Sequence, residues 1–224
     1  MASTSLDDVV GFLENGTWID VSRPVHADTA VWPGDTPFSR RWVRRTDRGD
    51  TVNLSSISLS VHTATHLDAP LHVDASASPV DVFPIAHFVG KVLVIDLQNT
   101  ETETIHPDLV QSIPSETKAV FFKTRHSKIS ETIWDSDWLP IDPETVSRLS
   151  AAGVVLVGTD APSVDPQESK TLPAHRALAA AGMLQLEGLR LSKAEAGAYL
   201  FVALPLRIEG SDASPVRVVL FKSD

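Results

Sequence analysis

The sequence predicts one α/β domain built around a mixed β-sheet. Several continuous apolar runs, such as residues 92–97, are typical of strands that are buried on both faces. Start and stop signals of α-helices stand between these runs. No internal repeat and no linker-like stretch divides the 224 residues.

The N-terminal segment differs from the rest of the chain. Within residues 1–16, apolar side chains recur at helical spacing, and Gly16 follows them as a stop signal. The recurring residues are Leu6, Val9, Val10 and Leu13. From residue 17 onward the pattern changes to short strand-like runs separated by turns. We therefore divide the chain into an N-terminal helical extension, 1–16, and a main domain, 17–224.

The main domain begins with a predicted turn and a predicted strand. Prolines fix φ within residues 31–37, and Gly34 between them can adopt a positive φ. Further on, Ile57, Leu59 and Val61 alternate with serines. Strict alternation of this kind predicts a strand with one buried face.

The rest of the main domain alternates between predicted strands and helices. The apolar runs at 92–97, 119–122 and 153–158 predict buried strands. Each predicted helix has a proline near its start and a glycine at its end, as helices favour. The remaining elements are helices over 142–153 and 172–182 and strands over 199–206 and 216–221.

Composition and charge exclude several classes of partner. Lys and Arg total 19 against 29 Asp and Glu, for a formal net charge of −10. The basic cluster at 40–45 is interrupted by Trp42 and Val43 and is followed by Asp47, so we interpret it as a solvated strand face rather than a nucleic-acid site. No apolar run approaches the roughly 20 residues of a membrane span. With no basic and apolar leader at residues 1–8, we expect a cytoplasmic protein without a membrane partner.

A cluster of histidines carries the chemistry. His62, His66 and His72 fall within eleven residues, with Asp68 among them, and the chain has no cysteine. An extended chain would separate His62 from Asp68 by about 20 Å at roughly 3.3 Å per residue, so a shared ion requires a tight loop. Imidazole and carboxylate ligands suit Zn, Mn or Fe(II) and do not decide among them. The simpler alternative is a set of hydrogen-bonded surface pairs.

One further histidine and one glutamate are candidates for the same site. His175 falls in the first turn of a predicted helix, where the helix dipole favours a neutral ring that can bind a metal. Glu187 lies in an apolar stretch, where an unpaired buried carboxylate is costly, so its side chain either faces water or meets a cation. We interpret the other histidines as structural or surface residues; these are His26, His87, His106 and His126.

The segment 62–72 resembles the signature of the metal-dependent cyclase-like hydrolases, usually written His-x-Gly-Thr-His-x-Asp-x-Pro-x-His. Flanking segments make the chain most similar to the bacterial-type kynurenine formamidases, or arylformamidases, of that superfamily. These segments are residues 31–37, 134–136, 158–170, 174–176, 186–188, 203–206 and 212–217. The likeness extends over nearly the whole main domain.

The resemblance implies a homodimer of compact domains, each with a barrel-like mixed sheet and peripheral helices. It also implies two Zn²⁺ per subunit, with Mn²⁺ suited to the same ligands. His62 and His66 would bind one ion and His175 the other. Asp68 would bridge both ions, and Glu187 would also reach the pair.

The resemblance further implies an activity and two roles around the metals. The substrate would be N-formyl-L-kynurenine, hydrolysed to L-kynurenine and formate in tryptophan degradation. His72 would be the general acid/base, and Trp32 would line the substrate pocket, although an ordinary core tryptophan is the alternative. Ala64 stands where the superfamily usually has glycine, and a positive φ there would strain it.

Two rival functions remain at this point. The same signature serves enzymes that hydrolyse cyclic amides such as isatin. A metal-binding protein that kept the fold without catalysis is the alternative from a different class.

Overall fold

The apolar runs of the sequence form the centre of the sheet in the computed structural model, which describes residues 5–222. Four neighbouring strands are parallel: β5 (Val89–Asp96), β6 (Thr117–Lys123), β7 (Leu156–Thr159) and β8 (Leu184–Glu187). Parallel strands are normally covered on both sides. Every residue of β7 and β8 is buried; the apolar run at 153–158 predicted this for β7, whereas β8 was not predicted from the sequence.

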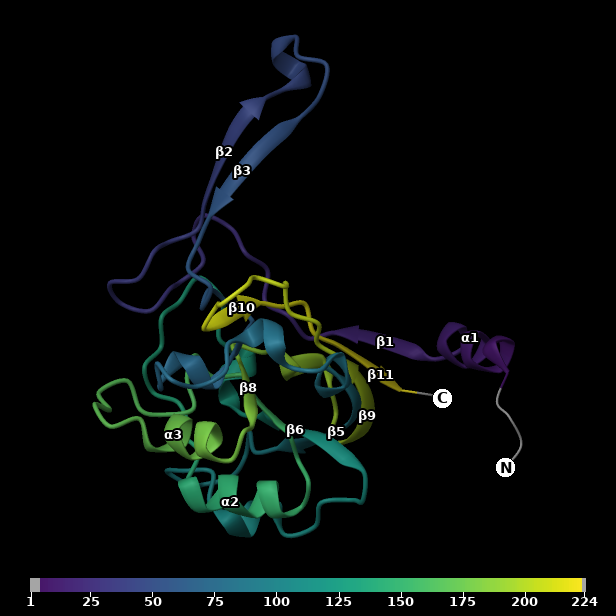
Figure 1. The fold of residues 1–224 in the computed structure, drawn as a ribbon, viewed down its shortest axis with the longest axis vertical. Coiled ribbons are helices and arrows are strands. Elements are labelled where there is room, and N and C mark those ends of the chain that lie inside the picture. Colours follow the sequence, from purple (N-terminus) through teal and green to yellow (C-terminus); the bar gives the residue numbers. More distant parts are fainter. Residues whose placement is uncertain (1–4, 223–224) are drawn as a thin grey trace.

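Antiparallel strands extend this centre on both sides. On one side lie β9 (Gly197–Val202), β11 (Val219–Lys222) and β1 (Thr17–Asp20), and on the other lie β4 (His66–Asp68) and β10 (Ala213–Pro215). The nine strands curl into a half-barrel in the order β1-β11-β9-β5-β6-β7-β8-β4-β10 (Figure 1). The prediction of a single α/β domain with a mixed, barrel-like sheet is confirmed.

The last two strands differ from their predicted ranges of 199–206 and 216–221. The first ends at Val202, and the second begins only at Val219. Between them, Pro205 and Val216 form an isolated bridge. Proline has no backbone N–H to contribute to a ladder, which accounts for the interruption.

Two hydrophobic cores cover the two faces of the sheet. Phe121 of β6 packs into the inner core, where its ring lies 5.8 Å from that of Phe201. The adjacent Phe122 faces the opposite side, in a core shared with α2 (Pro143–Ala151) and α3 (Pro173–Ala180). Full burial of a side chain of this size stabilises the fold by roughly 1.5–3 kcal/mol. Both helices begin at the proline that the sequence indicated.

The strand predicted to have one buried face is exposed instead. Strands β2 (Ser39–Arg44) and β3 (Leu54–Ser58) pair only with each other and project from the body of the molecule (Figure 1). Every residue of both strands is exposed, and Ile57 retains 60% of its accessible surface. The prediction of a half-buried strand was wrong because no second layer within residues 5–222 covers either face. The basic residues of β2 are solvated, as expected.

The N-terminal helix lies beside the edge of the sheet. Helix α1 (Leu6–Glu14) begins with a capping box in which Ser5 and Asp8 bond each other's backbone. The ring of Phe12 contacts Phe221 of β11, while Leu6 is largely exposed.

No helix within residues 5–222 is long and apolar enough to cross a bilayer. Short 3₁₀ helices complete the fold: Thr46–Arg48, Pro70–His72, Val80–Val82, Ile85–His87, Pro107–Val110, Arg125–Lys128 and Leu191–Lys193.

The loop that leads into β4 is tightly wound. Ala64 adopts a φ of +56°, and its carbonyl approaches the backbone of Gly188, where a Cβ would lie only 2.2 Å from that oxygen. Ala64 is therefore held in the left-handed region that favours glycine. The strain expected from the sequence is present at this residue.

Replacing Ala64 with glycine should raise the free energy of unfolding by up to about 1 kcal/mol. Relief of the left-handed alanine gains about 1–2 kcal/mol, and the added freedom of the unfolded chain offsets about 0.4–1 kcal/mol of that gain. Ala69→Gly is the matched control, because Ala69 is buried at a φ of −98°. Chemical denaturation should show Ala69→Gly destabilised and Ala64→Gly stabilised. Equal losses in both variants would contradict the strain.

Candidate metal centre

The register between β4 and β8 brings the central acidic residues together. His66 lies opposite Glu187, and Asp68 lies opposite Gln185. Residues two apart on a strand face the same side of the sheet, and paired residues on neighbouring strands share that side. These four side chains therefore project together on one face. All four are buried.

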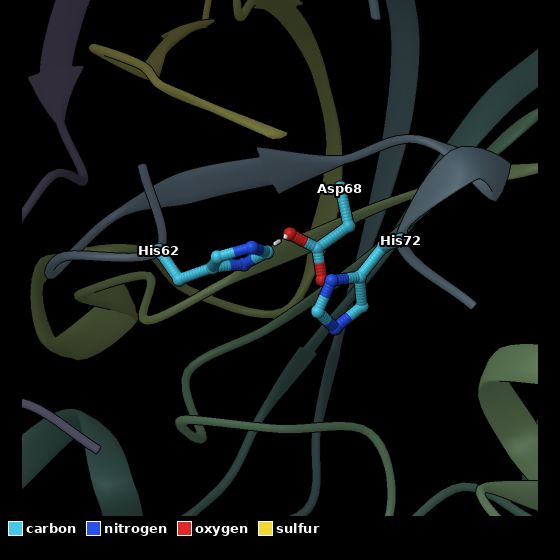
Figure 2. Close-up of side chains that lie close together, drawn as sticks. All are labelled: His62, Asp68 and His72. Atoms are coloured by element: carbon cyan, nitrogen blue, oxygen red, sulfur yellow. Dashed lines mark ion pairs between the residues drawn. The ribbon is translucent and has the colours of Figure 1, made fainter. Parts of the chain in front are cut away.

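Three histidines reach this group from separate segments. His62 lies in the turn before β4, His72 ends the 3₁₀ helix Pro70–His72, and His175 lies in the first turn of α3. Figure 2 shows the rings of His62 and His72 on either side of the Asp68 carboxylate. The chain thus folds back after residue 62, as a shared site requires.

Asp68 is the common point of contact. Its Oδ1 lies 2.9 Å from His62 Nδ1 and 3.4 Å from His66 Nε2, and its Oδ2 lies 3.9 Å from His175 Nε2. Burial disfavours the charged carboxylate, but the neighbouring imidazoles of His66 and His62 outweigh it and hold the pKa of Asp68 well below its usual range. Asp68 is therefore ionised at neutral pH.

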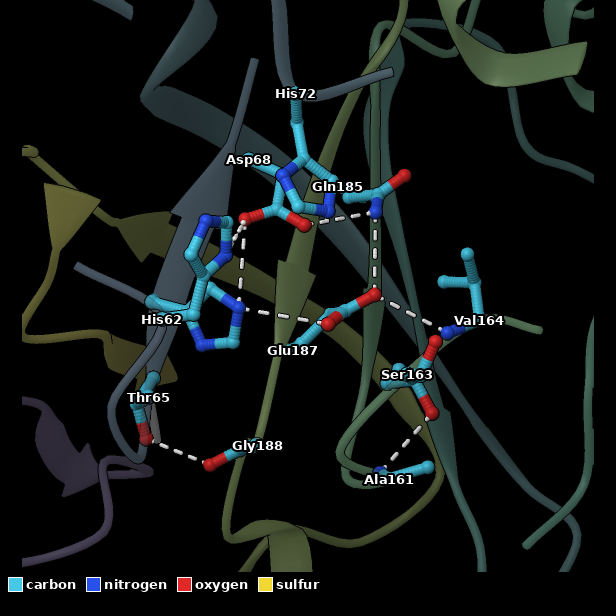
Figure 3. A network of polar contacts seen from close by, with 12 residues as sticks. His62, Thr65, Asp68, His72, Ala161, Ser163, Val164, Gln185, Glu187 and Gly188 are labelled. Atoms are coloured by element: carbon cyan, nitrogen blue, oxygen red, sulfur yellow. Dashed lines mark hydrogen bonds and ion pairs between the residues drawn. The ribbon is translucent and has the colours of Figure 1, made fainter. Parts of the chain in front are cut away.

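Glu187 is the second carboxylate of the group. Its Oε2 lies 3.4 Å from His66 Nε2, and its Oε1 lies 3.5 Å from His175 Nε2. Gln185 Nε2 donates to Asp68 Oδ2 at 3.0 Å and to Glu187 Oε1 at 3.1 Å (Figure 3). The backbone N–H of Val164 donates to the same Glu187 oxygen. The amide of Gln185 thus fixes the two carboxylates relative to each other.

Acceptors outside the group orient two of the imidazoles. His66 Nδ1 lies 3.1 Å from the carbonyl oxygen of Ala64, and His175 Nδ1 lies 2.7 Å from Asp165 Oδ2. A hydrogen bond at one ring nitrogen fixes which nitrogen is left to bind a metal. For both rings, Nε2 is the nitrogen that faces Asp68 and Glu187.

The pKa of His175 is shifted in the direction opposite to the sequence-based expectation. Burial lowers the pKa of this imidazole, but its hydrogen bond to Asp165 and the charges of Glu187 and Asp68 outweigh burial, so the pKa is raised. This direction is opposite to the one expected from the helix dipole, because three carboxylates face the ring. A cation that binds here competes with protons for the ring.

Asp212 contacts two of the histidines from the opposite side. Its Oδ2 lies 2.9 Å from His62 Nε2 and 3.5 Å from His72 Nδ1. The rings of His62 and His72 lie 4.3 Å apart. Burial disfavours the charge on His62, but Asp68 and Asp212 raise its pKa to about 10.

The residues fit a metal cation. Two buried atoms that face each other, His66 Nε2 and Asp68 Oδ1, have no hydrogen-bond partner among residues 5–222. Polar atoms left unpartnered in the interior are costly unless a cation binds them. Their nitrogen and oxygen donors suit Zn or Mn.

Ligand atoms within 4.8 Å of one another define two groups that share Asp68. One combines it with His62 and His72, and the other combines it with His66 and Glu187. The family resemblance had implied acid/base chemistry for His72 and had placed His62 and His66 on the same ion. His175 stands outside both groups, although its Nε2 lies near both carboxylates. The carboxylate of Asp68 could thus be a ligand in both groups.

An open cavity of about 520 Å³ lies over the cluster. Trp32 and Trp134 line it, with ring centroids 5.4 Å apart in an edge-to-face arrangement. Trp134 Nε1 donates to Gln167 Oε1 at 2.8 Å, which holds that indole in place. Trp32 is 37% exposed, so it is a cavity residue and not an ordinary core tryptophan.

Several residues of the site were not assigned roles from the sequence. Trp134, Asp165 and Asp212 lie within the segments that carried the resemblance, but their contacts depend on the folded chain. Gln185 could have been found by strand alternation, because it precedes Glu187 by two residues. Of the histidines set aside, His126 is buried and lines the cavity.

A curled α/β sheet that places imidazoles and carboxylates beneath an open cavity is typical of metal-dependent hydrolases. The chain belongs to the Cyclase family, whose model matches residues 19–166. It is 45% identical over 204 residues to the kynurenine formamidase of Salinibacter ruber, covering 90% of this chain and 96% of that protein.

Solved structures of similar fold agree with this family. One is described as a potential metal-dependent hydrolase with cyclase activity, with a TM-score of 0.81, 28% identity, and coverage of 93% of this chain and 99% of that chain. Another is isatin hydrolase A from Labrenzia aggregata bound to benzyl benzoate, with a TM-score of 0.84, 26% identity, and coverage of 98% and 99%.

Metal binding at pH 7.5 should release at least one proton per chain. His62 carries a proton in the metal-free protein because its pKa is raised to about 10, and a metal ligand must be deprotonated. Affinity should therefore rise as the pH increases from 7 toward 10. Calorimetric titration with Zn²⁺ in buffers of different ionisation enthalpy counts the protons released. Binding without proton release would show that these imidazoles are not ligands.

Proposed function

We propose that the protein is a zinc-dependent arylformamidase that hydrolyses N-formyl-L-kynurenine to L-kynurenine and formate. The observation that carries this proposal is the 45% identity to a kynurenine formamidase over nearly the whole of both chains. The buried cluster of imidazoles and carboxylates beneath a tryptophan-lined cavity supports it independently.

Five residues would hold two metal ions. Asp68 would lie between the ions, with His62, His66, His175 and Glu187 around them. When bound, such ions lower the pKa of water from about 15.7 toward about 7, which makes a nucleophile available at neutral pH. Manganese suits the same ligand set.

His72 would move the proton. Its ring lies beside the cluster, 4.3 Å from the ring of His62, and its side chain is partly exposed to the cavity. An imidazole in this position can take a proton from the attacking water and return it to the aniline nitrogen as the C–N bond breaks. Without that proton, the amine would leave as an unstable anion.

The tryptophans would bind the aromatic ring of the substrate. Trp32 presents its ring to the cavity and contacts Trp134 edge to face. Aromatic pairs of this kind stabilise a complex by roughly 0.5–1.5 kcal/mol beyond the burial of area. This contact would orient the formyl group toward the cluster.

We also propose that the protein is a homodimer. The projecting hairpin exposes Trp42, Val43 and Ile57, and α1 exposes Leu6 and Phe12. Apolar side chains concentrated on projecting elements mark interaction surfaces. A second copy of the chain would cover them.

The variant His72→Ala should lower kcat by about 10²–10⁴-fold while the metal content stays at the wild-type level. General acid/base residues contribute rate accelerations of this size without holding the metal. Elemental analysis and steady-state kinetics measure the two quantities. His87→Ala serves as the control, because His87 lies on the 3₁₀ helix Ile85–His87, away from the cluster. Loss of metal together with activity would identify His72 as a ligand.

The proposed function itself is tested by comparing N-formyl-L-kynurenine with isatin. Isatin hydrolysis is the second candidate because of the similarity to isatin hydrolase A. We expect turnover of the formamide that EDTA abolishes and Zn²⁺ restores. Turnover of isatin alone would support the second candidate. Metal binding with turnover of neither substrate would indicate a non-catalytic metal-binding protein.

A further inference from the structure

The carboxylate of Asp212 contacts two histidines of the site, His62 and His72, for which we propose different roles. It directly precedes β10, and the pairing of Ala213 with Asp68 places it beside the cluster. Its backbone carbonyl accepts a hydrogen bond of 2.9 Å from the N–H of Ala69. The residue is thus fixed to β4 through the backbone, while its side chain remains 43% exposed.

The two histidines meet the same oxygen of Asp212. Its Oδ2 lies 2.9 Å from His62 Nε2 and 3.5 Å from His72 Nδ1. An imidazole nitrogen that donates to a carboxylate carries a proton, so in the neutral ring, the form that binds a metal, the other nitrogen holds the lone pair. For His62 the second nitrogen is Nδ1, which faces Asp68 Oδ1 at 2.9 Å. For His72 it is Nε2.

We propose that Asp212 is a positioning residue shared between a metal ligand and the general acid/base. It holds His62 with Nδ1 directed at the metal position, and it holds His72 with Nε2 available for proton transfer. This inference rests on the proposed function for the role of His72, but not for the role of His62.

Because His62 and His72 share the Asp212 carboxylate, a substitution of Asp212 should affect both histidines. The other two inward-facing imidazoles have separate acceptors, Ala64 for His66 and Asp165 for His175. A change at either of those acceptors affects one ligand alone. A change at Asp212 affects metal affinity and proton transfer together, because both rings lose the same partner.

The experiment compares Asp212→Ala and Asp212→Glu with the wild-type enzyme. Removal of an outer carboxylate partner lowers metal affinity or activity by about 10–100-fold. For Asp212→Ala we expect Zn²⁺ affinity, measured by competition with a chelator, to fall by about 10–100-fold. We expect kcat at saturating Zn²⁺ to fall by about the same factor, with KM changed by less than about twofold. Asp212→Glu should recover part of both losses, because it restores a carboxylate.

A spectroscopic measurement separates positioning from general damage to the loop. In the zinc-loaded protein, ¹⁵N NMR of the imidazoles should show the His72 proton on Nδ1 in the wild type and a mixture of tautomers in Asp212→Ala. Asp81→Ala is the matched control, because Asp81 accepts a hydrogen bond from Gly210 in the same loop without touching a histidine. It should leave affinity, kcat and tautomer unchanged.

Specific results would overturn the proposal. Unchanged kcat in zinc-saturated Asp212→Ala would remove the link to His72, and unchanged zinc affinity would remove the link to His62; either result overturns the shared role. If Asp81→Ala lost as much zinc affinity and kcat as Asp212→Ala, the losses would come from a disturbed loop and not from the Asp212 carboxylate. If the wild type fails to hydrolyse N-formyl-L-kynurenine, the proposed function fails, while the affinity and tautomer measurements still test Asp212.

Discussion

The buried carboxylate of Asp68 is the constraint on which the site depends. An ionised carboxylate removed from water is costly by several kcal/mol unless opposite charges and hydrogen bonds compensate for it. Here imidazoles and the Gln185 amide surround it, and one oxygen still has no hydrogen-bond partner within residues 5–222. The protein alone leaves this charge incompletely satisfied. A bound cation would complete the compensation, so the charge of Asp68 favours a cation as the ligand of this site.

The fold supplies the rigidity that this arrangement requires. The pairing of β4 with β8 fixes Asp68 against Gln185 and His66 against Glu187, and cores on both faces of the sheet hold those strands. His62 lies in the turn before β4, His72 lies in the 3₁₀ helix after it, and His175 lies in α3. A rigid strand pair thus carries the carboxylates and His66, while the adjoining turn, 3₁₀ helix and α3 carry the other imidazoles. The histidine with a proposed proton-transfer role lies at the exposed rim, where it can reach a substrate.

Local patterns predicted much of this protein. Continuous apolar runs identified the central strands, proline and glycine marked both sheet-packing helices, and the spacing of histidines identified the segment that forms the cluster. The alternation of apolar and polar residues does not show whether another layer covers the apolar face of a strand. Ile57 was therefore expected to lie on a buried face, but its hairpin projects into solvent. Long-range contacts were also beyond reach. Asp212 meets His62 across 150 residues of sequence, and only the folded sheet places them together. The raised pKa of His175 has the same origin, because it depends on Asp165 in a loop and on carboxylates of β4 and β8.

A crystal structure of the protein grown with Zn²⁺ and measured at the zinc absorption edge tests the central claim most directly. The account predicts two anomalous peaks per chain, both in contact with the Asp68 carboxylate, with the His175 ring turned toward one of them. No peak beside Asp68 in crystals whose zinc content is established, or a His175 ring directed away from the carboxylates, would contradict it.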